Sequence, residues 1–196
     1  TSHLNEDYDR IIGKMEGVED VMPIQVFTNN CRASLEVVVF YGVPPEKIRT
    51  FRDFKLTAGS WSDFEANQDS GIIGQALADR KGIGPGDKYS IGGVTVTVAG
   101  VFTSQQAAEE SYVYTHLDFL QRARGLDSDG TVTQHEVLLA NSAVPLLVAD
   151  RIDDRFRRGP VETDTRPKGV FQASSLADLV DLIGLAEYLG YACLAL

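Results

Sequence analysis

Residues 71–102, GIIGQALADRKGIGPGDKYSIGGVTVTVAGVF, carry the clearest structural pattern of the chain, a helix followed by a turn and two strands. Ile73 and Leu77 share one face of the predicted helix, and Gly82 is typical of a helix end. The next residues, 83–87, include the Gly and Pro that favour a chain reversal. The segment therefore begins with a short, one-sided helix and then turns back.

Two runs of alternating apolar and polar residues follow, at 89–91 and 94–98. Alternation with a period of two indicates strands, each with one buried face. Two glycines separate the runs, and glycine accepts the positive φ angles of a two-residue hairpin loop. We therefore predict a β-hairpin, preceded by a second tight turn. The predicted structural turn residues are Gly86, Asp87, Gly92 and Gly93.

The glycines at positions 82, 84 and 86 could also suggest a phosphate-binding loop. In dinucleotide and Walker loops, however, the glycines lie between a strand and a following helix whose N-terminus faces the phosphate. Here the helix comes before the strand, and no G-x-x-x-x-G-K-[ST] motif occurs in the chain. We therefore expect no nucleotide cofactor.

Upstream of this segment the sequence predicts a helix, a strand pair and a short helix. Apolar residues recur at helical spacing over residues 4–16, and Gly17 ends the run. Residues 21–28 and 33–42 are rich in β-branched and aromatic side chains, which favour strands. Pro44-Pro45 breaks the second strand, and one or two helical turns are expected at residues 46–51.

Downstream the sequence predicts a strand at 136–140, a helix and a further strand at 161–165. Asn141 and Ser142 are candidate caps of the helix. Its apolar face consists of Val148, Ile152 and Phe156. Such a β-α-β unit buries its helix on one face of a sheet. The polar face carries mixed charges with Asp154 and Arg158 at i, i+4, which favours a solvated helix surface or, as an alternative, a partner-binding face.

Composition argues against two classes of partner, although the negative charge is also what solubility alone would require. The chain has 196 residues, of which 43% are hydrophobic, enough for one large domain or two small lobes with their own cores. Its formal net charge of -10 argues against nucleic acid or anionic lipid headgroups as partners, because association would begin with repulsion. Residues 1–10 are polar and contain no signal-peptide h-region, so an extracytoplasmic domain would need a segment upstream to deliver it.

No combination of residues predicts catalysis or metal binding. The histidines, His3, His116 and His135, lie in unrelated segments without the i, i+4 spacing of a helical zinc site. His135-Glu136 is the nearest approach to an acid/base pair, but it lacks a nucleophile or metal. Ser60, Ser70 and Ser111 have no G-x-S-x-G context. Cys31 and Cys193 cannot form a metal cluster by themselves, and they allow a disulfide without indicating one.

The aromatic residues around Trp61 predict packing rather than binding. Phe51, Phe54 and Phe64 lie close to Trp61 in the sequence. Large rings at this density are more typical of a small core than of a ligand platform.

Four segments, in order, resemble the extracytoplasmic core domain of MacB-type ABC transporter permeases. They are EGVEDVMP at 16–23, LTAGSWSDF at 56–64, the ALADRKGI, GD, GG and VAGVF pieces within 71–102, and YVYTHLDFLQRARG at 112–125. The resemblance covers roughly residues 16–125. It implies an α+β fold of two lobes: a porter-like β-α-β lobe built from both chain ends, residues 1–47 and 131–175, and an inserted, hairpin-rich lobe at 48–130.

The same resemblance implies a mechanical function without catalysis or cofactor. ATP-driven motion of the cytoplasmic domains would be transmitted through the membrane helices to export substrate across the membrane or extract it from the membrane. The implied partners are an ABC ATPase, reached through membrane and cytoplasmic parts outside this chain, a second permease copy, and a periplasmic adaptor or lipoprotein. The implied location is the extracytoplasmic side of the cell membrane.

Two points stay open. Residues 176–196 predict a helix, with Ser175 and Asp178 as a capping box, and Glu187 is the only charge from Leu182 onward. The mostly apolar part, residues 182–196, is too short to span a bilayer core, which needs about 20 residues, so the helix is either a packed terminal helix or the start of a transmembrane segment. The alternative function is a free-standing soluble module that binds a small ligand between its lobes. An enzyme using His135 or Glu136 is the third reading.

Overall fold

The computed structural model describes residues 4–31, 36–125 and 130–168, with backbone alone at 29–31, 36 and 37. The chain divides into two compact units, with the boundary between Ala140 and Asn141. Helices and strands are mixed in the first unit, and the second contains one helix among the described residues. The predicted α+β class is confirmed.

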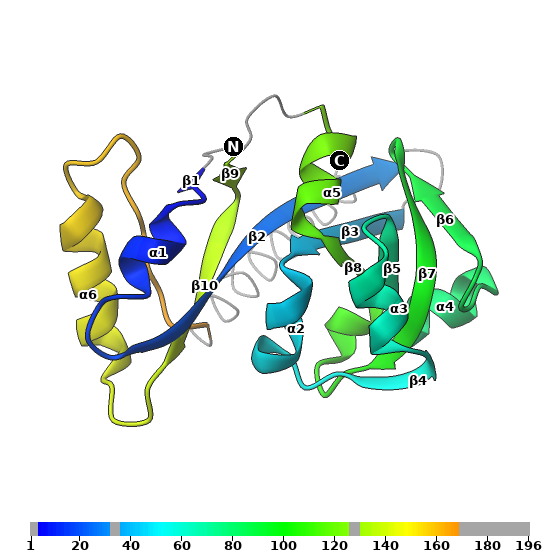
Figure 1. Ribbon diagram of the computed structural model, residues 1–196, viewed down its shortest axis with the longest axis horizontal. Helices are drawn as coiled ribbons and strands as arrows, with labels where there is room; N and C mark the ends of the chain where they lie inside the picture. The colour runs from blue at the N-terminus through cyan, green and yellow to red at the C-terminus, as the bar shows by residue number, and fades with distance from the viewer. Residues whose placement is uncertain (1–3, 32–35, 126–129, 169–196) are drawn as a thin grey trace, which may run out of the picture. The chain divides into compact units, whose positions relative to one another are not determined.

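The first unit is built on a mixed eight-stranded sheet (Figure 1). Its strands, in spatial order, are β10 (Gln134–Leu139), β2 (Val18–Cys31), β3 (Glu36–Val43), β8 (Tyr112–His116), β5 (Ser70–Gly74), β7 (Val94–Thr103) and β4 (Lys55–Gly59), and β6 (Lys88–Ile91) also pairs with β7. The β3–β8 and β5–β7 pairs are parallel and the others antiparallel. A separate antiparallel pair joins β1 (Leu4–Asn5) to β9 (Thr131–Val132).

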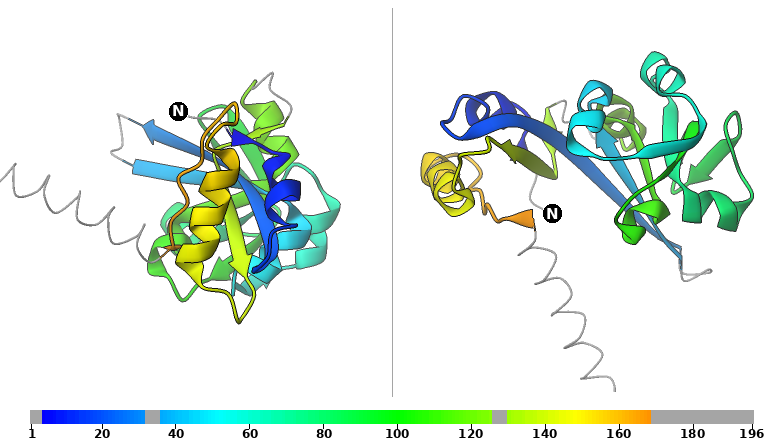
Figure 2. Two further views of the ribbon diagram at one scale, coloured as in Figure 1. Left: turned by 90° about the vertical axis from the view of Figure 1, so that its left-hand side faces the viewer. Right: turned by 90° about the horizontal axis from the view of Figure 1, so that it is seen from below.

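Strand β2 connects two parts of this sheet. Its first half pairs with β10 and its second half with β3. The right-hand view of Figure 2 shows β2 as one long, curved strand. The predicted strand pair at 21–28 and 33–42 is therefore confirmed from residue 36 onward in its second strand, since residues 33–35 lie outside the described part of the chain, and β2 is longer than its predicted strand. The additional length lets one strand hydrogen-bond to two different neighbours.

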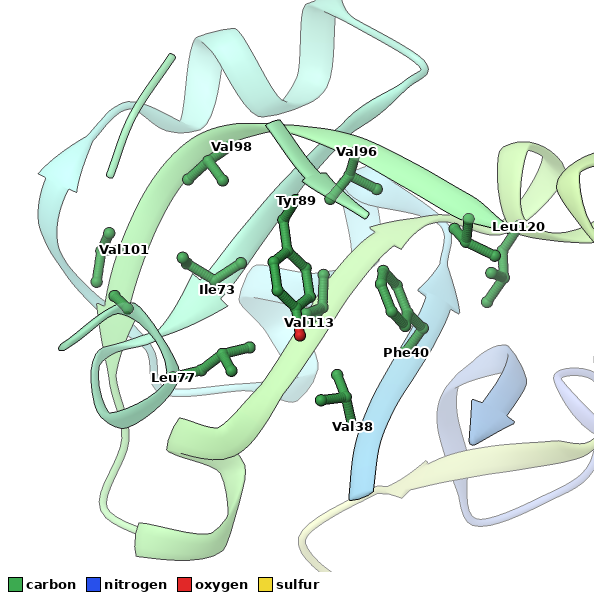
Figure 3. Packing of buried hydrophobic residues seen from close by; sticks show 12 residues of the cluster. Val38, Phe40, Ile73, Leu77, Tyr89, Val96, Val98, Val101, Val113 and Leu120 are labelled. Atoms are coloured by element: carbon green, nitrogen blue, oxygen red, sulfur yellow. The ribbon is translucent and has the colours of Figure 1, made fainter. Parts of the chain in front are cut away.

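Helices cover both faces of the sheet. They are α2 (Pro45–Phe51) and α3 (Trp61–Ala66) on one face and α4 (Gln75–Lys81) and α5 (Leu117–Ala123) on the other, as their buried residues show. Successive strand residues point to opposite faces. Accordingly, Ile73 and Val113 belong to the cluster with α4 and α5, whereas their neighbours Ile72 and Tyr114 belong to the cluster with α2 and α3. Figure 3 shows the first cluster, with the ring of Tyr89 in its middle, beside Val113.

A β-bulge changes which face of the sheet the side chains of β7 point to beyond Ala99. Val98 belongs to one cluster and Ala99 to the other, but Val101, rather than Gly100, returns to the first. The register against β5 shifts at this point, because Gly71 pairs with Val98 and Ile72 with Gly100. One extra residue on β7 thus reverses the alternation.

The segment at residues 71–102 differs from its prediction at its first residues. Residues 70–74 form strand β5, not the start of a helix, and the helix α4 begins only at Gln75. All five residues of β5 are buried, and the strand pairs with both β7 and β8. Its position in the middle of the sheet therefore overrides the helical spacing of Ile73 and Leu77. The predicted helix end is confirmed, because Gly82 caps α4 with φ 64°.

The rest of the segment forms a hairpin. Strands β6 and β7 pair antiparallel from Ile91 and Val94 outward. Between them, Gly92 and Gly93 have φ angles of 59° and 83°. Gly86 has φ 93°, and the carboxylate of Asp87 accepts a hydrogen bond from the amide of Gly84 at 2.9 Å. These contacts define the two turns that flank β6.

The N-terminal helix is shorter than the sequence predicts. Residues 4–16 contain the two-residue strand β1 and then α1 (Tyr8–Ile12). Pairing of β1 with β9 uses the residues that were predicted as the first helical turn. In contrast, the short helix after Pro44 is confirmed: α2 begins with Pro45 in its first turn.

In the second unit, helix α6 (Pro145–Phe156) has its predicted apolar face, since Val148, Ile152 and Phe156 are buried. The predicted caps are wrong, because the N-cap is Val144 and it makes no side-chain hydrogen bond. The i, i+4 pair of Asp154 with Arg158 is also wrong, since Asp154 forms an ion pair with Arg157.

The predicted strand at 161–165 is likewise wrong, so the β-α-β unit lacks its second strand among the described residues. A side chain takes the place of a strand partner here. The Asp153 carboxylate accepts hydrogen bonds from the hydroxyls of Thr163 and Thr165, each at 2.7 Å, and from the Thr165 amide at 3.1 Å. A carboxylate in this position competes with a β-ladder for the same backbone donor.

The predicted division into a porter-like lobe and an inserted lobe stays a prediction. Strands β10, β2 and β3, from the first predicted lobe, share one sheet with β8, β5, β7 and β4, from the second. The residues from 169 onward, including the predicted helix at 176–196, lie outside the described part of the chain. Within that part, none of the helices has the length and apolar character needed to cross a bilayer.

Candidate functional site

The side chains of His135 and Glu136 point to opposite sides of strand β10. In the sequence these two residues are the nearest approach to an acid/base pair. They are consecutive residues of β10, so their side chains lie on opposite faces of the strand. The His135 ring stacks on Tyr8 of α1, with the ring centroids 6.4 Å apart. Glu136 instead forms an ion pair with Arg52. This arrangement cannot combine the two groups in general acid/base catalysis.

Arg52 is the centre of a buried charge cluster in the first unit. It follows the last residue of α2, and only 6% of its side chain is exposed. Its Nη1 lies 2.5 Å from Oε2 of Glu136, and its Nε lies 3.5 Å from Oε1 of Glu109 in the 3-10 helix η1 (Ala107–Ser111). The cluster, defined as Arg52, Glu109 and Glu136, thus connects three segments that are far apart in the sequence.

Hydrogen bonds hold each end of the cluster in place. Nη1 of Arg52 donates to the carbonyl of Phe51 at 3.0 Å, and Nε donates to the Tyr114 hydroxyl at 3.4 Å. On the other side, Oε2 of Glu109 accepts a hydrogen bond from the Ser104 hydroxyl at 2.6 Å. The bond from Ser104 to Glu109 has the short length typical of a hydroxyl that donates to a carboxylate. The guanidinium and the Glu109 carboxylate therefore have fixed positions.

Aromatic rings lie next to the cluster, and the Arg52 guanidinium is 5.9 Å from the centre of the Tyr114 ring. Tyr41 stacks on Tyr114, with centroids 5.2 Å apart, and also contacts Tyr112. Burial, followed by the proximity of Tyr112, raises the pKa of Tyr41 to about 12, although Arg52 acts in the opposite direction. Burial also raises the pKa of Tyr114. Both phenols are therefore neutral at physiological pH and act as ring contacts and hydrogen-bonding groups, not as bases.

The guanidinium itself is held in its charged form. Burial on its own lowers the pKa of Arg52. The proximity of Tyr114 and of the Glu136 carboxylate raises the pKa by more than burial lowers it, so the net pKa lies above its ordinary value. Salt weakens the attraction between this permanent cation and its two carboxylates only slightly, because the three groups are largely shielded from solvent. The arrangement suits structural linkage between segments.

A second polar feature is a shallow cleft of about 270 Å³ in the first unit. Four carboxylates line it, together with Lys47, Gln68, His116 and several apolar residues; the carboxylates are those of Glu6, Asp9, Glu46 and Asp118. His116 is buried, and its Nε2 lies 2.6 Å from the carbonyl oxygen of Phe64. Because a carbonyl only accepts, Nε2 carries the proton in this contact.

The remaining residues that the sequence analysis considered as candidates make contacts that stabilise the fold. The Ser60 hydroxyl caps α3 by accepting the Asp63 amide at 3.1 Å, and the Ser70 hydroxyl donates to the Phe64 carbonyl at 2.8 Å. The predicted aromatic core is confirmed: Phe54 and Phe64 are buried in one cluster, and Phe51 and Trp61 pack against it. Among the described residues, no group of three or more His, Cys, Asp or Glu side chains could hold a metal ion. His3 and Cys193 lie outside the described residues.

Sequence reasoning missed Arg52 and Glu109. The only local signal is an arginine between two aromatic residues, in Phe51-Arg52-Asp53-Phe54. A long charged side chain in such a stretch must either reach solvent or find a buried partner. The partner, Glu136, lies in a strand that is distant in the sequence, so the local pattern could not identify it.

Comparison with known proteins agrees with this fold. A sequence model described as the MacB-like periplasmic core domain matches residues 1–155. The chain is also similar to the periplasmic region of MacB from Actinobacillus actinomycetemcomitans, with a TM-score of 0.64 and 10% sequence identity, over 89% of this chain and 84% of that one.

A second solved structure is similar to the same extent. It is the extracellular domain of the noncanonic ABC-type transporter YknZ from Gram-positive bacteria, with a TM-score of 0.63 and 16% identity, over 83% of this chain and 87% of that one. No curated protein matches the chain. At such low identity the two structures show a shared fold.

Proposed function

The chain belongs to the MacB-like periplasmic core domain family, and from this membership we propose that it transmits ATP-driven motion to a substrate that is exported across the membrane or extracted from it. It is the extracytoplasmic domain of a MacB-like ABC transporter permease. The proposal concerns what the domain does there: it works mechanically and catalyses no reaction itself. The family match over residues 1–155 is the observation that carries it.

The architecture of the first unit supports a mechanical function. One continuous sheet runs from β10 to β4, and helices pack on both of its faces. Close-packed interiors have low compressibility and transmit strain between elements. A displacement applied at one edge of such a sheet is therefore passed on rather than absorbed.

The partners of the domain follow from the same proposal. ATP would be hydrolysed by an ABC ATPase, connected through membrane and cytoplasmic parts outside this chain. A second permease copy would form a dimer, and a periplasmic adaptor or a lipoprotein would be the partner on the extracytoplasmic side. The net charge of -10 disfavours nucleic acid, as in the sequence-based expectation.

The cleft gives less support to the alternative of a soluble small-ligand-binding module. Its volume of about 270 Å³ lies below the range of roughly 300–1,000 Å³ that is usual for small-molecule sites. Four carboxylates line it beside one lysine, and the closeness of like charges opposes binding of an anionic ligand. Native mass spectrometry of the purified chain would detect a retained ligand, and its presence would favour the module.

The transmission proposal is tested in the complete transporter, reconstituted with its ATPase in lipid vesicles. The Phe64→Ala variant removes a fully buried ring from one of the two clusters and should loosen the domain without touching the ATPase. We expect substrate export to fall while ATP hydrolysis continues. Leu146→Ala, at a side chain that is 64% exposed, is the control and should export normally. Normal export by a Phe64→Ala transporter whose domain is shown by limited proteolysis to be unfolded would contradict the proposal.

A further inference from the structure

Strand β10 occupies a special position in the first unit. It lies at the edge of the sheet, where β2 is its only strand partner among the described residues, and it is the last element before the second unit begins at Asn141. The backbone hydrogen bonds of β10 within the sheet are made to β2, so a displacement of β10 that spreads through these bonds passes through β2 first. A second connection would therefore change how motion spreads from this strand.

The Arg52 cluster provides that second connection. Glu136 of β10 contacts Arg52, and Arg52 in turn contacts Glu109 of η1. The exposed fractions of the three side chains are small: 6% for Arg52, 11% for Glu109 and 21% for Glu136. Attraction between buried charges is weakly screened by salt, so the contacts persist under ionic conditions that weaken surface pairs.

The connecting side chain is itself held rigidly. The Arg52 amide donates to the carbonyl of Ile48 at the end of α2, and the guanidinium donates to the carbonyl of Phe51. The guanidinium also lies 5.9 Å from the centre of the Tyr114 ring in the middle of the sheet. A long side chain fixed at both its root and its head has little freedom to absorb a displacement.

From these contacts we propose that Arg52 couples β10 to η1 and to the end of α2, so that a displacement of β10 is passed directly across the first unit. The coupling rests on the proposed mechanical function of the domain and specifies a route for it. Glu136 is the receiving group on β10, and Glu109 is the group that extends the route to η1.

Another ion pair offers a matched control. Lys47 lies in α2, the helix that ends just before Arg52; its Nζ is 2.8 Å from the Asp20 carboxylate and donates to the Val21 carbonyl at 2.6 Å. This pair joins α2 to β2 and not to β10, and about a third of each side chain is exposed. Removing it changes the same helix and the same kind of interaction without touching the proposed route.

Hydrogen exchange, read by mass spectrometry on the 196-residue chain near neutral pH, tests the coupling. Glu136→Gln keeps the size and one acceptor oxygen of the side chain but removes its charge, and Arg52→Met removes the cation at similar length. Each should accelerate exchange in both β10 and η1 by about tenfold, the factor that corresponds to one lost charge-assisted hydrogen bond. The buried strand β5 should exchange at the wild-type rate, and Lys47→Met should change neither β10 nor η1.

Two results would overturn the coupling. Faster exchange confined to β10 in Glu136→Gln would mean that the strand moves independently of η1. Acceleration by one common factor in β10, η1 and β5 would mean that the cluster contributes only global stability. Should Arg52→Met fail to fold, Glu136→Gln decides between these outcomes by itself.

The coupling and the proposed function can fail separately. If Glu136→Gln accelerates exchange in both β10 and η1 while export by the complete transporter is unchanged, the coupling exists but export does not depend on it. The transmission function itself is decided by the Phe64→Ala test. If export is lost without any change in exchange at η1, the domain still transmits motion but the route through Arg52 is wrong.

Discussion

Gly74 packs directly against the backbone of Glu110. A Cβ atom built on Gly74 would lie 2.2 Å from the carbonyl oxygen of Glu110, closer than real Cβ atoms approach any atom. The φ angle of Gly74 is an ordinary -68°, so the requirement for glycine here is steric and not conformational. This contact places the start of α4 against η1, the 3-10 helix that also contributes Glu109 to the charge cluster.

Gly74→Ala should therefore destabilise the chain by about 3 kcal/mol, because the new methyl group forces the backbone of η1 away. Urea unfolding followed by circular dichroism measures the change. Gly84→Ala is the matched control, since a Cβ at Gly84 would meet no atom within 4 Å. It should be neutral or slightly stabilising, by up to about 1 kcal/mol. Equal destabilisation by both variants would show that the contact with Glu110 is not tight.

His135 should make stability depend on pH. Burial lowers the pKa of His135 below its ordinary value of 6.5, more than the Glu6 carbonyl and the Asp9 carboxylate raise it. The unfolded chain then takes up this proton at a higher pH than the folded chain does. The contribution of His135 is therefore fully present above about pH 6.5 and is lost as the pH falls toward the lower, folded-state pKa.

His135→Phe, which keeps a ring beside Tyr8, should remove this part of the pH dependence. Urea midpoints measured between pH 8 and pH 5 should fall less steeply for the variant than for the wild-type chain. At pH 8 the imidazole is neutral in both states, so the difference there reports packing alone. Parallel curves over the whole range would show that His135 titrates equally in the folded and unfolded chains.

Phe64 should be among the most costly residues to truncate. Its side chain is fully buried, and its ring lies in edge contact with His116, with centroids 5.0 Å apart. Phe64→Ala should lower the free energy of unfolding by about 3–5 kcal/mol, the usual cost of losing a buried ring and leaving a cavity. The exposed Leu146→Ala variant should change it by less than about 0.5 kcal/mol. A small effect of Phe64→Ala would mean that the neighbouring rings refill the space.

Asp153 should hold the segment after α6 in place. Its carboxylate accepts hydrogen bonds from two threonine hydroxyls and from the Thr165 amide. In Asp153→Ala, exchange of the Thr165 amide should accelerate by about tenfold, because its acceptor is lost. The adjacent Asp154→Ala variant removes only an exposed ion pair with Arg157 and should leave this amide unchanged. The same acceleration in both variants would assign the effect to fraying of α6 instead.

Local elements were predictable where the residues themselves specify them. The hairpin of β6 and β7 follows from alternating side chains and two glycines at its loop, all within a few residues of each other. The end of α4 follows in the same way from Gly82. Errors occurred where distant residues compete: residues 70–74 have helical spacing, yet pairing with β7 and β8 makes them a central strand.

The charge cluster could not be predicted for a related reason. Arg52 and Glu136 meet only because α2 lies over the face of the sheet to which Glu136 points. Conversely, the neighbours His135 and Glu136 suggested one site, but strand geometry separates them to opposite faces. Sequence distance is a poor guide to either relationship in a sheet whose strand order departs from chain order.

The sequence by itself determined the turns, the short helix after Pro44, the apolar face of α6 and the resemblance to MacB-type permeases. These depend on backbone preferences and on the periodicity of neighbouring side chains, which act over a few residues. Only the tertiary structure decided that residues 70–74 form a strand, that the segment at 161–165 is held by Asp153, and that Arg52 joins β10 to η1. Each of these depends on contacts between distant segments, whose energy exceeds the small local preference that opposes it.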